Sequence, residues 1–270
     1  MSSFGMPTLI ETQTLQDCVL LCRSLGLDFI ELNMNLPQYQ LPALNADHLR
    51  AVAEEYGLYF TIHLDENLNP ADFNPHVAAA WRRTVLETID LAQRLHTPIL
   101  NMHLPRGVYF TLPDRKVYLF DQYREQYLAS IRAFRDQCAA CIDERGPVIL
   151  IENTDGFLPF QMDAISLLLE SPAFGLTLDV GHSHVAGGAD ESFILHHASS
   201  LRHMHLHDAL GRSNHLPLGG GEVDLPNYLS LAESRGCRVV LETKTIEGLG
   251  QSASWLRSHG YLRSSASLHR

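Results

Sequence analysis

Short hydrophobic runs alternate along the chain with longer stretches in which hydrophobic residues recur at every third or fourth position. The short runs are typical of buried strands, and the longer stretches are typical of amphipathic helices. The expected strands are 6–10, 29–33, 58–64, 98–103, 148–152, 174–179, 201–207 and 238–242. The expected helices are 15–25, 45–56, 74–92, 120–145, 161–170, 191–199, 226–235 and 251–261.

The strict alternation of strand and helix implies a parallel sheet, because parallel strands need a crossover between them. Eight such units in 270 residues predict an α/β fold, a single (β/α)8 TIM barrel. A doubly wound open sheet is the alternative, but no glycine-rich phosphate fingerprint follows the first strand. We expect one domain over residues 1–270, with a long loop at 104–119 and a frayed tail at 263–270.

Six expected strands have, at or near their last residue, a His, Asp or Glu that strand alternation directs into the barrel. These are the strand ends where TIM barrels place their active sites. These residues are His63, His103, Glu152, Asp179, His205 and Glu242, and Glu31, His203 and His207 share the inward faces of their strands. Burying so many ionisable groups is unfavourable unless they pair with one another or hold a cation. Carboxylate oxygens and imidazole nitrogens suit zinc, manganese and similar divalent ions, so the pattern predicts a metal site. A structural polar network is the alternative.

Several of these residues lie in motifs that resemble the xylose isomerase-like TIM barrel superfamily. The motifs are Ile-Glu152-Asn-Thr, Leu-Asp179-Val-Gly-His182, Met-His205-Leu-His-Asp208, His215-Leu-Pro-Leu-Gly-Gly-Gly and Leu-Glu242-Thr-Lys244. That superfamily includes sugar and sugar-phosphate isomerases and epimerases, some dehydratases, and abasic-site nucleases of the endonuclease IV type. The resemblance implies that Glu152, Asp179, His205 and Glu242 bind one divalent ion, which could be Zn²⁺, Mn²⁺, Co²⁺ or Mg²⁺.

The resemblance also implies an activity, a metal-dependent isomerase or epimerase of a small sugar, sugar phosphate or related polyhydroxy ketone. Glu152 and Glu242 would move protons through a metal-stabilised enediolate, and His182 would hold a substrate hydroxyl. In such an enzyme we expect His63, His103 and His215 to contact the carbohydrate substrate. The alternatives are a sugar-acid or cyclitol dehydratase, a phosphodiester hydrolase of the endonuclease type, and a barrel that binds metal or sugar without turnover.

The nuclease members hold three zinc ions, and histidines that match His63 and His103 help to bind the first of them. The sequence therefore leaves open a second ion near these two residues. The third ion of the nucleases needs an Asp-x-His pair, and this chain has Ser213 where that aspartate belongs. We therefore do not expect a third ion.

Three further residues near the expected rim are basic. Lys244 follows Glu242 by two positions and is directed to the same rim, where it could bind a phosphate or carboxylate or form a salt bridge within its loop. Arg106 and Arg115 lie in the long loop and are expected at the solvated surface. Glu31 is expected to be a structural or supporting carboxylate.

The charge and the ends of the chain limit its partners. A formal net charge of −11 gives no general attraction to nucleic acid or anionic membranes, so we expect neither as a partner. No apolar stretch has the length of a transmembrane helix, and the first residues show no signal segment, so a cytoplasmic protein is expected. Cys138 and Cys141 continue a helical apolar stripe, which favours packing over a metal or redox role. The sequence leaves open whether the chain forms a homo-oligomer.

Overall fold

The computed structural model describes residues 2–262, so the expected tail at 263–270 lies outside the described residues. Eight strands pair in parallel around a closed barrel, in the order β1-β12-β9-β8-β7-β4-β3-β2. They are β1 (Ser3–Pro7), β2 (Phe29–Asn33), β3 (Tyr59–His63), β4 (Ile99–His103), β7 (Val148–Glu152), β8 (Phe174–Asp179), β9 (Leu201–Leu206) and β12 (Arg238–Leu241). The predicted (β/α)8 TIM barrel is thus confirmed.

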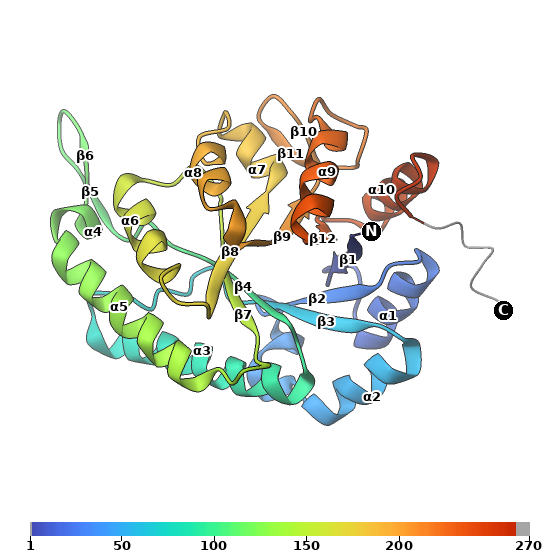
Figure 1. Ribbon diagram of the computed structural model, residues 1–270, viewed down its shortest axis with the longest axis horizontal. Coiled ribbons are helices and arrows are strands. Elements are labelled where there is room, and N and C mark those ends of the chain that lie inside the picture. The colour runs from blue at the N-terminus through green and yellow to red at the C-terminus, as the bar shows by residue number, and fades with distance from the viewer. Residues whose placement is uncertain (1, 263–270) are drawn as a thin grey trace.

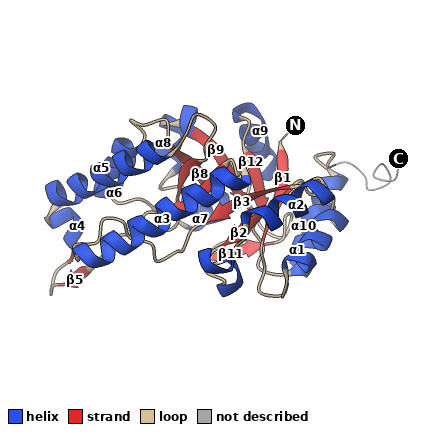
Figure 2. Ribbon diagram, turned by 90° about the horizontal axis from the view of Figure 1, so that it is seen from below, coloured by secondary structure: helices blue, strands red, loops and turns tan. Residues whose placement is uncertain are grey.

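Helices follow the barrel strands and cover the barrel from outside (Figures 1 and 2). They are α1 (Leu15–Ser24), α2 (Ala46–Tyr56), α3 (Pro75–Leu95), α4 (Leu119–Gln122), α5 (Arg124–Cys141), α6 (Pro159–Leu168), α8 (Glu191–His196), α9 (Leu225–Arg235) and α10 (Ile246–Ser258). Two of the expected helices begin at side-chain caps, because Asn45 accepts a hydrogen bond from the His48 backbone amide and Asn74 accepts one from the His76 backbone amide. Such caps satisfy amide groups that the first helical turn leaves unpaired.

The first strand lies earlier than predicted, at Ser3–Pro7 instead of 6–10. Its pairing with β12 begins at Ser3 opposite Arg238, and Ile10, the last residue of the predicted strand, is 81% exposed. Gly5 explains why the hydrophobic pattern was misleading here. A Cβ atom at this position would lie 2.5 Å from the Phe29 ring, so the strand uses a glycine where a close approach to β2 is needed.

The stretch 104–119, predicted to be a loop without secondary structure, contains an antiparallel hairpin of β5 (Tyr109–Thr111) and β6 (Lys116–Tyr118). The hairpin extends away from the barrel (Figure 1). All three residues of β5 are exposed, so neither strand shows the buried alternation that would have identified it.

Two other elements at the strand ends were not predicted. The short helix α7 (Val180–Val185) follows β8 directly, and Asp179 caps it by accepting a hydrogen bond from the His182 backbone amide at 2.7 Å. A second hairpin, β10 (Asp208–Leu210) and β11 (Ser213–Leu216), follows β9. The last helix, α10, begins at Ile246 instead of 251, because Thr245 caps it through the Gly248 amide.

Cys138 agrees with the packing interpretation, but Cys141 does not. All five cysteines are free, and Cys138 is buried within α5 whereas Cys141 is exposed. Within residues 2–262, no helix combines the length and the apolar character needed to cross a membrane.

Candidate metal centre

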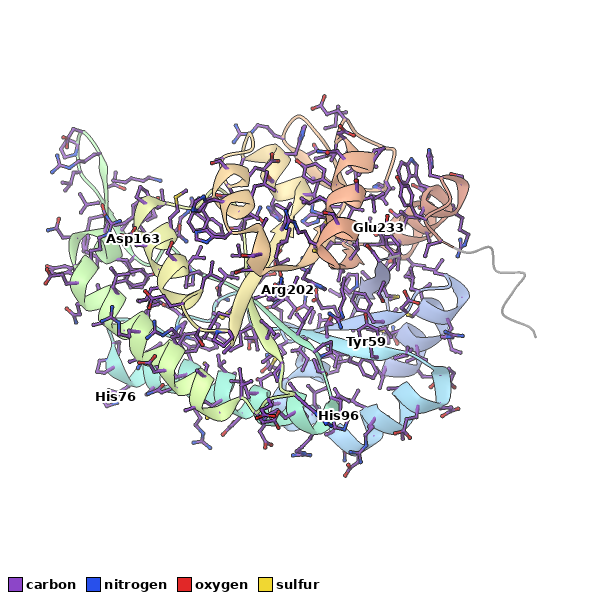
Figure 3. The ribbon with its side chains drawn as sticks, viewed as in Figure 1. Tyr59, His76, His96, Asp163, Arg202 and Glu233 are labelled. Atoms are coloured by element: carbon purple, nitrogen blue, oxygen red, sulfur yellow. The ribbon has the colours of Figure 1, made fainter. Side chains whose placement is uncertain are left out.

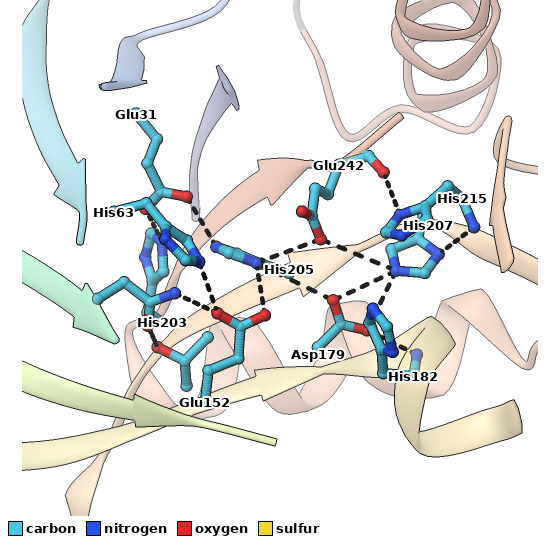
Figure 4. Close-up of polar contacts among 12 residues, drawn as sticks. Glu31, His63, Glu152, Asp179, His182, His203, His205, His207, His215 and Glu242 are labelled. Atoms are coloured by element: carbon cyan, nitrogen blue, oxygen red, sulfur yellow. Dashed lines mark hydrogen bonds and ion pairs between the residues drawn. The ribbon is translucent and has the colours of Figure 1, made fainter. Parts of the chain in front are cut away.

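Four side chains meet at the carboxyl ends of β7, β8, β9 and β12 (Figure 4). His205 Nδ1 lies 3.0 Å from Glu152 Oε1, 3.3 Å from Glu242 Oε2 and 4.0 Å from Asp179 Oδ2. One potential ligand atom from each residue lies within 4.8 Å of the others. The strand alternation had directed all four into the barrel, and the structure brings them together. Their role as ligands remains a prediction.

The donor set of these four residues fits a divalent cation. Three carboxylates converge on one imidazole nitrogen, and three of the four residues are fully or almost fully buried, while the side chain of Glu242 is 14% exposed. Within the described chain, His205 Nδ1 and Glu242 Oε2 are buried atoms without a hydrogen-bond partner. Buried polar atoms are rarely left unpaired, and a cation bound between them would satisfy both.

Glu31 supports His205 from the other side of its ring. His205 Nε2 lies 2.9 Å from Glu31 Oε1, while the other oxygen of Glu31 lies 3.1 Å from His203 Nε2 and accepts a hydrogen bond from Thr61 Oγ1 at 3.2 Å. Histidine ligands commonly have their second nitrogen bound to a carboxylate, which fixes the ring orientation. Glu31 is therefore placed as the supporting carboxylate that the sequence suggested.

A second group lies beside the first, where the sequence left open another ion. His63 Nε2 lies 3.2 Å and His103 Nε2 3.4 Å from Glu152 Oε2, which also accepts a hydrogen bond from the Asn101 amide. His63 Nδ1 lies 2.8 Å from the Leu64 carbonyl, so this nitrogen donates and Nε2 remains directed at the group. His63, His103 and Glu152 together could hold a cation.

The remaining expected substrate residues lie beside the four-residue cluster. His182 and His215 have ring centroids 5.3 Å apart, and both are partly buried. Lys244 Nζ lies 2.8 Å from Glu242 Oε1, so the salt bridge that the sequence left open is present. Ser213, in the place of the nuclease aspartate, is exposed on β11.

The two arginines of the 104–119 stretch do not join the site. Arg106 donates hydrogen bonds to the carbonyls of Asp155 and Gly156 at 2.9 and 2.6 Å, which ties its loop to the loop after β7. Arg115 pairs with the neighbouring Asp114 and is exposed.

Sequence reasoning missed His207, to which it gave no role. His207 is fully buried, and its Nε2 lies 3.1 Å from Asp179 Oδ1. The available signal was that His207 and His205 lie on the same inward face of their strand. That alternation alone could not show which carboxylate His207 contacts.

A hollow of about 570 Å³ at the other end of the barrel is unrelated to this cluster. Ser3, Tyr59 and Arg238, which begin β1, β3 and β12, line it together with His96, and Figure 3 labels Tyr59 and His96. In TIM barrels the amino-terminal face serves stability, so we assign no chemistry to this hollow.

The charges in the cluster determine its protonation without metal. Burial raises the pKa of Glu152, but the rings of His205 and His103 outweigh burial and hold that pKa well below its usual value. Burial lowers the pKa of His205, but the carboxylates of Glu152 and Glu31 outweigh it and hold that pKa well above its usual value. The metal-free cluster therefore keeps ionised glutamates around a protonated His205 at neutral pH.

This protonation predicts that metal affinity rises with pH. A divalent ion must displace the proton on His205 Nδ1, and the raised pKa keeps that proton bound through the neutral range. We expect the association constant for Zn²⁺ to rise by about tenfold per unit between about pH 6 and about pH 8. Competition with a chelator of known affinity measures it. An association constant that does not change over this range would contradict the assignment of His205 as a ligand.

Comparison with known proteins identifies the family. The family model described as xylose isomerase-like TIM barrel matches residues 19–259. The chain belongs to this family. The resemblance seen in the sequence motifs is thereby confirmed. An uncharacterized protein of Methanocaldococcus jannaschii is 24% identical over 211 residues, which cover 77% of this chain and 74% of that protein.

Two solved structures share the fold over nearly the whole chain. A D-tagatose 3-epimerase-like protein superposes with a TM-score of 0.77 at 20% identity and covers 95% of this chain and 96% of its own. The IOLI protein, whose structure has a bound zinc atom, gives a TM-score of 0.72 at 15% identity, with 96% of this family member and 98% of that protein covered. At these identities the similarity establishes the fold and leaves the activity to be argued from the site.

Proposed function

We propose that this family member is a divalent-metal-dependent isomerase or epimerase of a small sugar, sugar phosphate or related polyhydroxy ketone. The proposal rests mainly on one observation, that the carboxylates of two glutamates lie close to the same imidazole nitrogen. Glu152 and Glu242 approach His205 Nδ1 from β7 and from the end of β12, at 3.0 and 3.3 Å. Two carboxylates that share a centre can face a bound ketose from different sides, as an exchange of protons at carbon requires.

The two glutamates are not equivalent in their hydrogen bonding. The Oε2 atom of Glu152 accepts a hydrogen bond from the side-chain amide of Asn101 and lies 3.2 and 3.4 Å from Nε2 of His63 and His103. Glu242 Oε1 accepts a hydrogen bond from Lys244 Nζ, whereas its Oε2 has no hydrogen-bond partner among residues 2–262. Because the Glu242 side chain is 14% exposed and that of Glu152 only 2%, we assign Glu242 as the group that removes the proton and Glu152 as the group that returns one.

The ion that fits this donor set would be held by Glu152, Asp179, His205 and Glu242. When bound, it supplies Lewis acidity that polarises the substrate carbonyl and makes the neighbouring C–H more acidic. The similarity to the zinc-containing IOLI structure supports Zn²⁺ as one candidate, beside Mn²⁺, Co²⁺ and Mg²⁺. The partly buried His103, His182 and His215, with the buried His63, offer nitrogen atoms for substrate hydroxyl groups beside this donor set.

The charge of the chain supports a carbohydrate over a nucleic acid. The net charge is −11, and the rim position of the nuclease aspartate holds the uncharged Ser213. A dehydratase would use the same base but would expel a β-hydroxyl group, so it differs from an isomerase in its product and not in its first proton transfer.

A substrate screen tests the proposal. The metal-free protein is supplied with Zn²⁺, Mn²⁺, Co²⁺ or Mg²⁺ and incubated with ketoses, their phosphates and inososes. We expect an isomeric product for at least one compound, and we expect chelation to abolish its formation and added metal to restore it. Cleavage of abasic DNA without any isomer formation would contradict the proposal, and loss of water would favour the dehydratase.

A further inference from the structure

We propose that His207 is a positioning residue that holds the Asp179 carboxylate, and that the backbone of His215 fixes the ring of His207 in the tautomer this task requires. The inference rests on the proposed function only in that Asp179 is taken as a metal ligand. The hydrogen bonds that define the tautomer belong to the chain itself.

His207 directs one nitrogen at the carboxylate of Asp179. The residue directly follows β9 and is fully buried, and its Nε2 lies 3.1 Å from Oδ1 and 3.2 Å from Oδ2 of Asp179. The Oδ1 atom also accepts the His182 amide at 2.7 Å. Oδ1 therefore faces two donors, whereas Oδ2 shares only the His207 Nε2 donor and is the oxygen near His205 Nδ1, where the ion is expected.

The other nitrogen of His207 faces a donor. The backbone N–H of His215 donates to His207 Nδ1 at 2.8 Å. A nitrogen that accepts a hydrogen bond carries no proton, so the neutral ring must have its proton on Nε2, where it donates to Asp179. The Asp208 carbonyl is 3.4 Å from Nδ1, farther than the His215 amide.

The conformation of His215 makes this arrangement possible. Its φ of 55° lies in the left-handed region, which residues other than glycine seldom adopt. Its own ring is anchored, because Nδ1 lies 3.1 Å from the Glu242 carbonyl and so donates to it. His215 thus connects two of the expected ligands. Its ring is hydrogen-bonded to the backbone of Glu242, and its backbone amide is hydrogen-bonded to His207, which holds Asp179.

Gly181 provides the space for the His207 ring. A Cβ atom at position 181 would lie 1.9 Å from Cε1 and 2.1 Å from Nδ1 of His207, which no side chain could occupy. The glycine of the Asp-Val-Gly-His motif and the second histidine of the His-Leu-His-Asp motif are therefore packed against each other. Gly181 and His207 therefore both contribute to the orientation of Asp179.

The tautomer also bears on a third metal ion. His182, His207 and His215 form a group whose nitrogens lie within 4.8 Å of one another, which on distance alone could hold a cation. A histidine that binds metal through Nε2 normally donates its Nδ1–H to an acceptor. Nδ1 of His207 faces a donor instead, so its Nε2 keeps the proton and has no lone pair for an ion.

Two substitutions separate positioning from ligation. His207→Gln keeps a donor and an acceptor in one planar amide, so it can serve both Asp179 and the His215 amide. His207→Leu removes both hydrogen bonds. Zinc content by elemental analysis and the zinc dissociation constant by chelator competition are measured for both, with His76→Leu, an exposed residue on α3, as the matched control (Figure 3).

We expect His207→Gln to bind as many zinc ions per chain as the unsubstituted protein, with a similar dissociation constant. His207→Leu should bind zinc about 10–100-fold more weakly, the usual effect of losing a partner of a metal ligand. A His207→Gln protein that holds one ion fewer would show that His207 is itself a ligand. An unchanged dissociation constant in a folded His207→Leu protein would also overturn the inference.

The tautomer is tested without any metal. Nitrogen-15 NMR of metal-free protein with labelled histidine should show the His207 proton on Nε2, assigned by its loss in His207→Gln. A proton on Nδ1 would overturn the inference even if the zinc results agreed. If the unsubstituted protein binds no divalent ion at all, the proposed function fails, and the tautomer alone decides whether His207 is held as described.

Discussion

Replacement of Glu242 by glutamine is expected to lower turnover by a factor on the order of 10² or more, while the protein keeps much of its metal. Glutamine has almost the same size and retains a neutral oxygen for the ion, but it cannot accept a proton from carbon. Burial raises the pKa of Glu242, but the nearby His205 ring outweighs burial and holds that pKa well below its usual value. The natural side chain is therefore ionised at neutral pH, which leaves it able to accept a proton.

Glu152→Gln should also lose turnover, since the second carboxylate has to return a proton to the opposite face of the substrate. A matched control is Glu222→Gln, which removes a carboxylate that is 50% exposed and pairs with His184 at 3.1 Å outside the centre. Metal content and steady-state rates are measured for all three variants. If Glu152→Gln and Glu242→Gln both convert substrate at near the unsubstituted rate with metal bound, the two-glutamate mechanism is wrong.

Replacement of Asp179 by alanine is expected to abolish metal binding and activity together. The carboxylate is fully buried, and it is the expected ligand, the cap of α7 and the acceptor for His207. Loss of a supporting partner alone weakens metal binding by about 10–100-fold. Loss of the ligand itself should therefore weaken it by more than about 100-fold, as titration with Zn²⁺ would measure.

Asp179→Asn serves as the control for folding, because its amide oxygen can still accept the His182 N–H and cap α7. Thermal unfolding without metal should therefore be closer to the unsubstituted protein for Asp179→Asn than for Asp179→Ala. An Asp179→Ala protein that binds zinc as tightly as the unsubstituted chain would remove Asp179 from the ligand set.

The barrel was predictable because its signals are local. Strands buried on both faces appear as continuous apolar runs, and helices appear as periodic stripes that begin at caps such as Asn45 and Asn74. The approach of the four expected ligands was predictable for a related reason. The period of two within each strand, together with the common rim of a parallel barrel, directs residues far apart in sequence to one place.

The features that could not be predicted depend on contacts between distant segments. The hairpin formed by β5 and β6 has strands of three residues each, too short for a periodic pattern. The helix α7 contains Gly181, which disfavours helix, and it is stabilised by the Asp179 cap. The role of His207 depends on the backbone amide of His215, eight residues later. The pattern of side chains in the sequence does not indicate where that amide is directed.

The transfer of a carbon-bound proton is the central claim, and NMR in D₂O measures it most directly. The metal-loaded protein is incubated with the ketose or sugar phosphate on which it is most active, and the signal of the hydrogen beside the carbonyl is followed. We predict that deuterium replaces this hydrogen with the metal-loaded protein, and that exchange disappears in the metal-free protein and in Glu242→Gln. Isomer formation with complete retention of that hydrogen, or exchange that continues unchanged in Glu242→Gln, would contradict the proposed function.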